Sequence, residues 1–131
     1  MIVLDASVLI AHLDGTDPHH EAALGLLLDG ADDELAFAAS VVTIAEVLVA
    51  PARAGRLGHA EGALRTLGVE AVPLGGDAPT RLAQLRVDTG LRMPDCCVLL
   101  AAQDCGRLLA TFDDRQASRA RALGLRVLTR P

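Results

Sequence analysis

Short apolar segments alternate with helical segments along the whole chain, and this alternation restricts the fold more than any other feature of the sequence. We predict strands over residues 2–4, 35–38, 69–74, 107–111 and 125–129. Helices are predicted between them, over residues 6–13, 18–29, 40–51, 51–68 (broken near Gly55 and Gly58), 77–89, 95–104 and 115–123. Such alternation is typical of a mainly parallel sheet with helices on both faces. We therefore expect an α/β fold, a three-layer α/β/α sandwich with a mainly parallel central sheet of about five strands.

Length and composition predict one compact domain over residues 1–131. Of the 131 residues, 51% are hydrophobic, which is enough for a single core. Asp5 interrupts the apolar N-terminal segment and no apolar run is long enough to span a membrane, so we expect neither a signal peptide nor membrane association. Cys96, Cys97 and Cys105 lack the spacing of a disulfide framework, and no histidine lies at zinc-ligand spacing from them. We expect reduced cysteines and a cytoplasmic protein.

Glu46 is the only charged residue in an otherwise apolar segment from Ser40 to Pro51. Ser40 is a favourable N-cap and Pro51 is a helix-stop signal, so the segment is predicted to be a helix. A helix that is apolar on all sides is usually buried, and no basic residue lies three or four positions from Glu46. A buried carboxylate must be paired, protonated or bound to a metal ion. Two interpretations remain open: a salt bridge to one of the twelve arginines, or metal coordination together with other carboxylates.

Three further carboxylates are predicted near the edge of the sheet where the parallel strands end. Asp5 directly follows the first predicted strand, Asp113 follows the fourth, and Asp95 begins a helix. Ligands of such sheets bind beyond the carboxyl ends of the strands. Glu46 lies one to two turns into the helix that follows the second strand. Four carboxylates cannot all ionise close together without a cation, and an oxygen-only set favours Mg²⁺ or Mn²⁺ over zinc.

Most of these acids also have a structural interpretation. Asp95 is a suitable N-cap, and Asp113 fits the common use of Asp in a turn after a strand. Asp114 is either a surface acid or takes the place of Asp113 as the fourth acid. Asp5 follows a buried strand and has no obvious structural task. The joint pattern is therefore more informative than any single member.

Two hydroxyl residues, Ser7 and Thr111, each lie two positions from a candidate acid. Their hydroxyl groups would hold a water molecule of the metal's hydration shell. The structural alternatives are that Ser7 caps the first helix and that Thr111 only ends a strand.

The four histidines support a competing, metal-free mechanism in which imidazoles act as general acid and base on RNA. His19 and His20 lie in the first turn of a predicted exposed helix, and His12 and His59 lie near a helix end or a kink, so we interpret them as surface residues. The sequence contains no P-loop or dinucleotide-binding glycine pattern. It lacks the lysine that receiver domains use, and residues 5–7 (DAS) do not match the Asp-x-Asp pattern of haloacid-dehalogenase-type phosphatases.

Charge is distributed unevenly along the chain. The net charge is −5, but residues 1–50 hold nine acids and no arginine, whereas residues 51–131 hold twelve arginines and eight acids. If four carboxylates bind metal ions, only one of the five net negative charges remains, so the acidic total does not exclude a phosphate-bearing substrate. Arg115, Arg119 and Arg121 follow Asp113 on the next predicted helix, where they either contact an RNA backbone or form a solvated face.

Four segments in this order resemble the acidic motifs of PIN-domain nucleases: residues 2–10 (IVLDASVLI), Glu46, residues 94–102 (PDCCVLLAA) and residues 111–113 (TFD). The resemblance covers nearly the whole chain, and the chain's length resembles that of VapC, the toxin of VapBC toxin–antitoxin pairs. Cys96 and Cys97 occupy positions where small or apolar residues are expected, which is a mild departure from the pattern.

This resemblance implies a single PIN-like domain in which Asp5, Glu46, Asp95 and Asp113 bind the metal ion, with Ser7 and Thr111 as polar support. It implies a Mg²⁺- or Mn²⁺-dependent endoribonuclease that cleaves cellular RNA and stops translation by metal-assisted hydrolysis. It also implies a homodimer and a cognate VapB-like antitoxin whose C-terminal segment covers the acidic groove.

Two other functions remain open from the sequence. One is a PIN nuclease that acts outside a toxin pair, in RNA processing or on structured DNA. The other is a non-catalytic binding module whose acidic pocket holds an arginine of a partner protein. The sequence does not identify the RNA, because only Phe37 and Phe112 are available as aromatic stacking residues.

Overall fold

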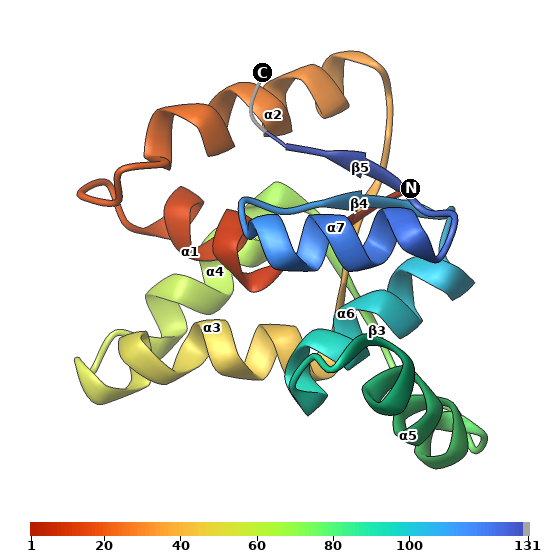
Figure 1. The fold of residues 1–131 in the computed structure, drawn as a ribbon. Helices are drawn as coiled ribbons and strands as arrows, with labels where there is room; N and C mark the ends of the chain where they lie inside the picture. Colours follow the sequence, from red (N-terminus) through yellow and green to blue (C-terminus); the bar gives the residue numbers. More distant parts are fainter. Residues whose placement is uncertain (130–131) are drawn as a thin grey trace.

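A parallel five-stranded sheet with the order β3-β2-β1-β4-β5 forms the centre of the computed structural model, which describes residues 1–129 (Figure 1). The strands are β1 (Ile2–Leu4), β2 (Phe37–Ser40), β3 (Val69–Val72), β4 (Leu108–Ala110) and β5 (Arg126–Leu128). Every neighbouring pair is parallel. The carboxyl ends of all five strands therefore lie at one edge, and the predicted α/β sandwich with about five strands is confirmed.

Helices cover both faces of the sheet and make the three layers. They are α1 (Ala6–Leu13), α2 (His20–Asp32), α3 (Val41–Arg53), α4 (Leu57–Leu67), α5 (Ala78–Thr89), α6 (Met93–Asp104) and α7 (Asp114–Ala122). Figure 1 shows α2 and α7 on opposite sides of β4 and β5. None of the helices in the described part of the chain is long and apolar enough to cross a membrane.

Strand residues alternate between two hydrophobic cores, as the twofold periodicity of a strand requires. Val3 of β1 packs in the core that α5, α6 and α7 cover, together with Leu109 of β4. Ile2 and Leu4 pack in the core that α1, α2 and α4 cover. The three central strands, β1, β2 and β4, are almost entirely apolar because both of their faces are covered, whereas the edge strands β3 and β5 carry exposed residues.

The chain reverses its direction of travel across the sheet at β1. It runs from β1 to β2 and β3 on one side, and then returns to β4 and β5 on the other side. Such a reversal is a topological switch point, where ligands bind beyond the carboxyl ends of the strands. Because Leu4 pairs with Ala110, Asp5 and Thr111 are the next residues on two adjacent strands.

Several predicted helix ends differ from the observed ones. Pro51 does not stop its helix, because α3 continues for two residues beyond it, to Arg53. Gly30 lies inside α2 rather than after it, and a Cβ there would lie 3.0 Å from atoms of Ile2 and Phe37. Glycine at this position therefore lets α2 approach the sheet closely.

The expectation that the apolar helix α3 buries Glu46 is wrong. Only Thr43 and Val47 of this helix are fully buried, whereas Glu46 and its neighbour Val49 are exposed. Val42, Ile44 and Leu48 are half-buried and pack against the two cores, whereas Glu46 and Val49 lie on the face of α3 that is left to solvent. An apolar sequence is thus not sufficient to bury every residue of a helix when part of the helix surface has no neighbour.

Candidate functional site

Asp5 occupies the centre of the switch point. It follows β1, its backbone N–H donates to Ala110 O at 3.0 Å, and its side chain is 5% exposed. Carboxylate oxygen Oδ2 accepts two hydrogen bonds, from Ser7 Oγ at 2.7 Å and from Thr111 Oγ1 at 2.8 Å. Within residues 1–129 no hydrogen bond reaches the second oxygen, Oδ1, so this oxygen is available to a ligand.

The two hydroxyl groups connect Asp5 to the backbone that follows β4. Ser7 Oγ accepts a hydrogen bond from Phe112 N at 3.0 Å, and Thr111 Oγ1 accepts one from Asp113 N at 3.1 Å. Each hydroxyl therefore donates to the carboxylate and accepts from the chain. The predicted polar support thus has a definite geometry: Ser7 and Thr111 fix the Asp5 carboxylate, and Ser7 makes no side-chain cap on α1.

Asp113 is the N-cap of α7, and its Oδ1 accepts a hydrogen bond from Gln116 N at 3.0 Å. Asp114, predicted to lie in a loop, is the first residue of α7. Both side chains are exposed. The backbone N–H of Asp113 donates to Thr111, whose hydroxyl in turn donates to Asp5. Asp114 has no such connection to Asp5, so Asp113 is favoured as the fourth acid.

Gln116 is a site residue that the sequence analysis missed. Its side chain is 1% exposed, and its Nε2 donates to Asp95 O at 3.1 Å. It therefore joins the first turn of α7 to the first turn of α6, and so Asp113 to Asp95. Its Oε1 is buried without a hydrogen-bond partner in the described chain. The only feature in the sequence that could have indicated it is an amide side chain four residues after Phe112.

Asp95 and Glu46 show that the acids lie within electrostatic reach of one another. Burial raises the pKa of Asp95, and repulsion from Asp5 and Asp113 raises it further, while Arg92 and Arg115 oppose the shift. Although Glu46 is exposed as a residue, partial desolvation of its carboxylate raises its pKa, and repulsion from Asp95 and Asp5 adds to this against the attraction of Arg92. Asp95 is therefore within electrostatic reach of the other three acids that the sequence selected.

The acids are not neutralised by close arginines. In residues 1–129 the salt bridges are those of Arg81 with Asp77 and Asp104, at the start of α5 and the end of α6. The salt-bridge interpretation of Glu46 therefore finds no support in this part of the chain.

The donor set fits a hard divalent cation in its chemistry, because it offers only carboxylate oxygens and leaves Asp5 Oδ1 free. Among the described residues, no three acidic, histidine or cysteine side chains converge closely enough to form a complete metal cage. Mg²⁺ commonly binds through one or two carboxylates and keeps several waters, which such an open arrangement allows.

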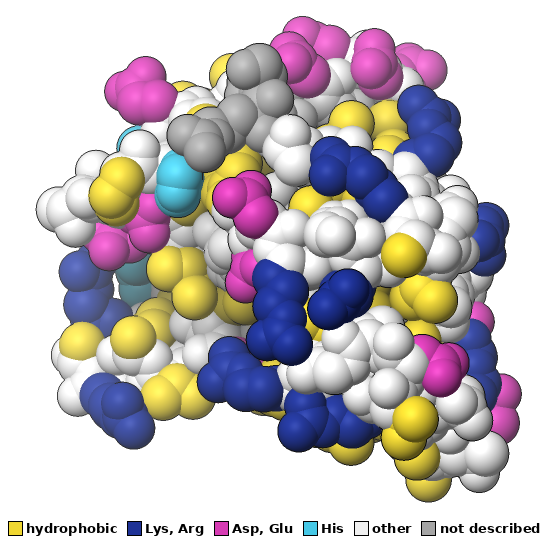
Figure 2. Space-filling view, in the orientation of Figure 1, with side chains coloured by type: hydrophobic (Ala, Val, Ile, Leu, Met, Phe, Trp, Pro, Cys, Tyr) yellow, Lys and Arg dark blue, Asp and Glu magenta, His cyan; other side chains and the backbone are white. Residues whose placement is uncertain are grey.

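Arginine side chains gather beside acidic ones on the face drawn in Figure 2. Arg119 and Arg121 are exposed on α7. Arg115 is also exposed, but its Nη2 donates to Gly90 O at 3.2 Å. Part of the Arg115 guanidinium is thus already used within the chain, which leaves Arg119 and Arg121 as the freer pair on this helix.

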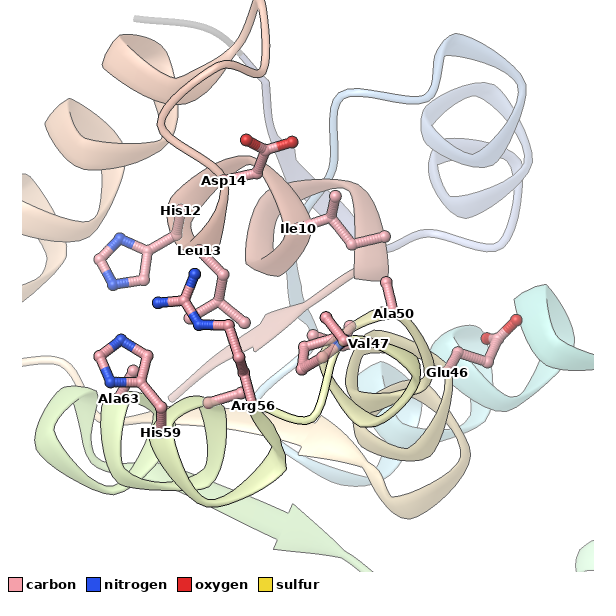
Figure 3. A pocket seen from close by; sticks show the side chains of 13 residues that line it. Ile10, His12, Leu13, Asp14, Glu46, Val47, Ala50, Arg56, His59 and Ala63 are labelled. Carbon is pink, nitrogen blue, oxygen red and sulfur yellow. The ribbon is translucent and has the colours of Figure 1, made fainter.

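A groove of about 500 Å³ runs between α1, α3 and α4 and ends at Glu46 (Figure 3). Apolar side chains line most of it, and His12, Arg56 and His59 add polar groups. In Figure 3 the Glu46 carboxylate points away from the two histidines. The groove shares only Glu46 with the four acids, so it adjoins the acidic site without containing it.

The histidines do not form an acid–base pair at the acids. Partial burial and the charge of His20 lower the pKa of His12. His20 Nδ1 lies 2.7 Å from Ala11 O, which assigns this nitrogen the proton. His19 stacks on Phe112 with ring centroids 5.0 Å apart, the only aromatic pair in the described chain. His19 thus contacts Phe112, the residue next to Asp113.

Solved structures with this fold include several toxin–antitoxin proteins. The sarcin-ricin loop cleaving toxin VapC20 of Mycobacterium tuberculosis superposes with a TM-score of 0.76 at 17% identity, over 100% of both chains. VapBC2 from Rickettsia felis, bound to a DNA fragment from its promoter, gives 0.75 at 14% identity over 100% of both chains. A toxin–antitoxin complex from Klebsiella pneumoniae gives 0.72 at 22% identity over 90% of this chain and 91% of that chain.

Comparison of the amino-acid sequence with curated proteins finds no match. The model of the PIN domain family matches residues 2–122. Since this segment spans most of the chain and contains Asp5, Glu46, Asp95 and Asp113, the protein belongs to the PIN domain family.

Proposed function

We propose that the protein is a metal-dependent endoribonuclease and the toxin of a type II toxin–antitoxin pair, which cleaves cellular RNA in the cytoplasm and so inhibits translation and growth. The observation that carries the nuclease proposal is the Asp5 carboxylate, which is held by two hydroxyls with one oxygen free, beside three further acids at the switch point. Membership of the PIN domain family and the toxin–antitoxin structures with the same fold support the toxin assignment.

Asp5, Glu46, Asp95 and Asp113 would hold Mg²⁺, for which Mn²⁺ substitutes. When bound, the ion supplies activation of water and stabilisation of negative charge on the phosphate. Ser7 and Thr111 fix the orientation of Asp5, and Gln116 holds the start of α7 against Asp95. Arg119 and Arg121 would bind the RNA backbone beside the acids.

RNA cleavage in the presence of Mn²⁺ tests the nuclease proposal. Asp5→Asn keeps the size and both hydroxyl contacts of the side chain but removes its charge, so cleavage should fall to background while the circular dichroism spectrum stays unchanged. EDTA should abolish cleavage by the wild-type protein, and added Mn²⁺ should restore it. Cleavage that persists in EDTA would overturn the metal mechanism and favour general acid–base catalysis by the histidines.

An antitoxin is the proposed partner. The VapBC2 and Klebsiella structures are complexes of a toxin–antitoxin type. In this chain the groove between α1, α3 and α4 leads to Glu46, so a partner segment that fills the groove would reach the acidic site. We also propose that the protein forms a homodimer. Val41 and Val49 are exposed apolar residues of α3, and they leave a helix surface that a second copy of the chain would cover.

Genomic context and copurification separate the toxin from a PIN nuclease of RNA processing. A small reading frame directly upstream, whose product copurifies and inhibits cleavage, is the expected result. A nuclease that is active without any such neighbour would favour the processing role. Calorimetry with Mn²⁺ addresses the non-catalytic alternative, since a binding module would show no Mn²⁺ binding that depends on Asp5 and Asp95.

A further inference from the structure

The loop between α5 and α6 is held in place by two arginines. Arg86 Nη1 donates to Gly90 O at 3.1 Å and to Leu91 O at 2.6 Å, and Arg115 Nη2 also donates to Gly90 O, at 3.2 Å. Gly90 has a φ of +71°, and a Cβ there would lie 3.4 Å from Arg115 Nη2. The backbone that leads to Arg92 therefore has a fixed conformation.

Arg92 ends this loop and is the N-cap residue of α6, one turn before Asp95. Its carbonyl accepts a hydrogen bond from Cys96 N at 3.1 Å, which fixes its backbone to the helix. Its side chain is exposed, and within residues 1–129 it makes no hydrogen bond and no ion pair. Arg92 lies three residues before Asp95, so both side chains start from the first turn at the beginning of α6.

A phosphodiester substrate needs a cationic group at this position. Four carboxylates repel an approaching phosphate, and a bound cation offsets only part of that charge. A guanidinium presents two parallel N–H groups that match the oxygens of a phosphate. Among the three arginines around the loop, Arg86 and Arg115 donate to backbone carbonyls, and Arg92 alone is uncommitted in the described chain.

We propose that Arg92 binds a backbone phosphate of the RNA next to the scissile bond and so positions the substrate over the acids. This inference rests on the proposed nuclease function. It assigns Arg92 to substrate binding and not to metal binding. It also differs from the role of Arg119 and Arg121, because Arg92 is joined directly to the helix that carries Asp95.

Variants of Arg92 with matched controls test this assignment. Arg92→Gln removes the charge, Arg92→Lys keeps the charge without the planar fork, and Arg126→Gln removes an exposed arginine at the amino end of β5, on the opposite edge of the sheet. Affinity for a fluorescein-labelled single-stranded RNA is measured by anisotropy in the Asp5→Asn background, over a series of salt concentrations. Steady-state cleavage by the otherwise wild-type variants gives KM and kcat.

Arg92→Gln should weaken RNA binding about 10- to 100-fold, as expected for a hydrogen-bonded charge pair. It should raise KM more than it lowers kcat, and reduce the log–log salt slope by about 0.7, the contribution of one phosphate contact on a single strand. Arg92→Lys should keep the salt slope and lose only part of the affinity. Arg126→Gln should match the wild-type protein in KM.

Three results would overturn the assignment. The first is an Arg92→Gln variant that equals Arg126→Gln in RNA affinity and salt slope. The second is a lower affinity of Arg92→Gln for Mn²⁺ in calorimetry, which would mean that Arg92 shapes the acidic site instead. The third is an Arg92→Gln variant that keeps its RNA affinity but no longer binds a glutamate-rich peptide. Arg92 would then bind a carboxylate of a partner protein instead of an RNA phosphate. A wild-type protein that binds this RNA without cleaving it would instead overturn the nuclease function, while the binding comparison still measures the role of Arg92.

Discussion

At the scale of single residues, the position of Asp5 follows from three side chains. The register of β1 and β4 places Asp5 beside Thr111, and the hydroxyls of Ser7 and Thr111 both donate to the same carboxylate oxygen. These hydrogen bonds leave the other oxygen free and determine where it points. Removing one hydroxyl should therefore disturb the candidate metal site without removing any of its acids.

Thr111→Val tests this support. The valine has a similar shape but leaves Asp5 Oδ2 with one donor and Asp113 N without its acceptor, so the free energy of unfolding should fall by about 1–3 kcal/mol. Affinity for Mn²⁺ should fall about 10- to 100-fold, as for other groups that orient metal-binding side chains. Denaturant unfolding and calorimetry measure the two quantities. The control Thr80→Val changes an exposed threonine on α5 and should leave both unchanged; an unaltered Mn²⁺ affinity in Thr111→Val would contradict the positioning role.

Asp95 gives a pH-dependent prediction. Its pKa in the folded protein is raised, chiefly by burial, above the value in the unfolded chain of about 4. Its stabilising contribution is therefore fully present below that unfolded pKa and is lost as pH rises through the raised pKa. At pH 7 the charged Asp95 opposes folding of the metal-free protein, so Asp95→Asn should raise Tm in EDTA.

This gain should shrink as pH falls toward about 4, where the wild-type carboxyl becomes protonated. Thermal melting of both proteins in EDTA, at pH values from 7 down to about 4, measures how the gain in Tm changes with pH. Glu34→Gln, in an exposed turn, serves as the control and should show no such pH-dependent gain. A Tm of Asp95→Asn below that of the wild-type protein at pH 7 would show that Asp95 is paired after all.

The sequence was sufficient to select the acids but not to describe their surroundings. Asp5 and Asp113 could be found because an acid that follows an apolar strand lies at the edge of a parallel sheet where ligands bind. The environment of Glu46 was predicted wrongly, because the sequence does not show which face of a helix its neighbours cover. Gln116 and Arg92 were missed because their importance depends on contacts with other elements, such as the Asp95 carbonyl, that no spacing along the chain reveals.

At the scale of elements, α7 joins a structural and a chemical role in Asp113. This residue caps the helix through Gln116 N and is also a proposed metal ligand. Asparagine caps about as well as aspartate, whereas alanine costs about 1 kcal/mol at an N-cap. The two substitutions therefore separate the roles.

Asp113→Asn should keep the free energy of unfolding within about 0.5 kcal/mol of the wild-type value, and Asp113→Ala should lower it by about 1 kcal/mol. Both should lose RNA cleavage, because both lack the charge. Urea unfolding and a cleavage assay are the measurements, with Asp114→Asn as the comparison. If Asp113→Asn stays active while Asp114→Asn does not, Asp114 is the fourth acid.

The elements themselves were predicted well in type and order but less well at their ends. Strand and helix periodicities differ strongly, so the alternation of the two identified the sheet and its layers. The ends of α2 and α3 were missed because Gly30 and Pro51 act there as packing and late-helix residues rather than as stops. The role of Gly30 depends on the neighbours of its helix, because this position faces Ile2 and Phe37.

At the scale of the whole molecule, the fold joins an acidic half of the chain to a basic half. Residues 1–50 carry no arginine and supply Asp5 and Glu46, whereas residues 51–131 supply Asp95, Asp113 and all twelve arginines. The order β3-β2-β1-β4-β5 places strands of the two halves side by side at β1 and β4. The metal-free protein therefore carries repulsion that the folded state alone creates, because the unfolded chain separates these acids.

A divalent cation should for this reason stabilise the whole fold. A ligand that binds only the folded state adds about 2.7 kcal/mol to the free energy of unfolding at 100 times its Kd. For a chain of this length, that corresponds to a rise in Tm of roughly 10 °C. Differential scanning fluorimetry over a Mn²⁺ series, started from EDTA-treated protein, measures the shift.

The dependence of this shift on individual acids identifies its origin. Asp5→Asn and Asp95→Asn should each abolish most of the shift, whereas Glu34→Gln should keep it in full. Since Asp95→Asn also loses a repelled charge, its metal-free Tm should not lie below that of the wild-type protein. A Mn²⁺ shift that survives in both variants would place the ion elsewhere on the molecule and would separate metal binding from the acids at the switch point.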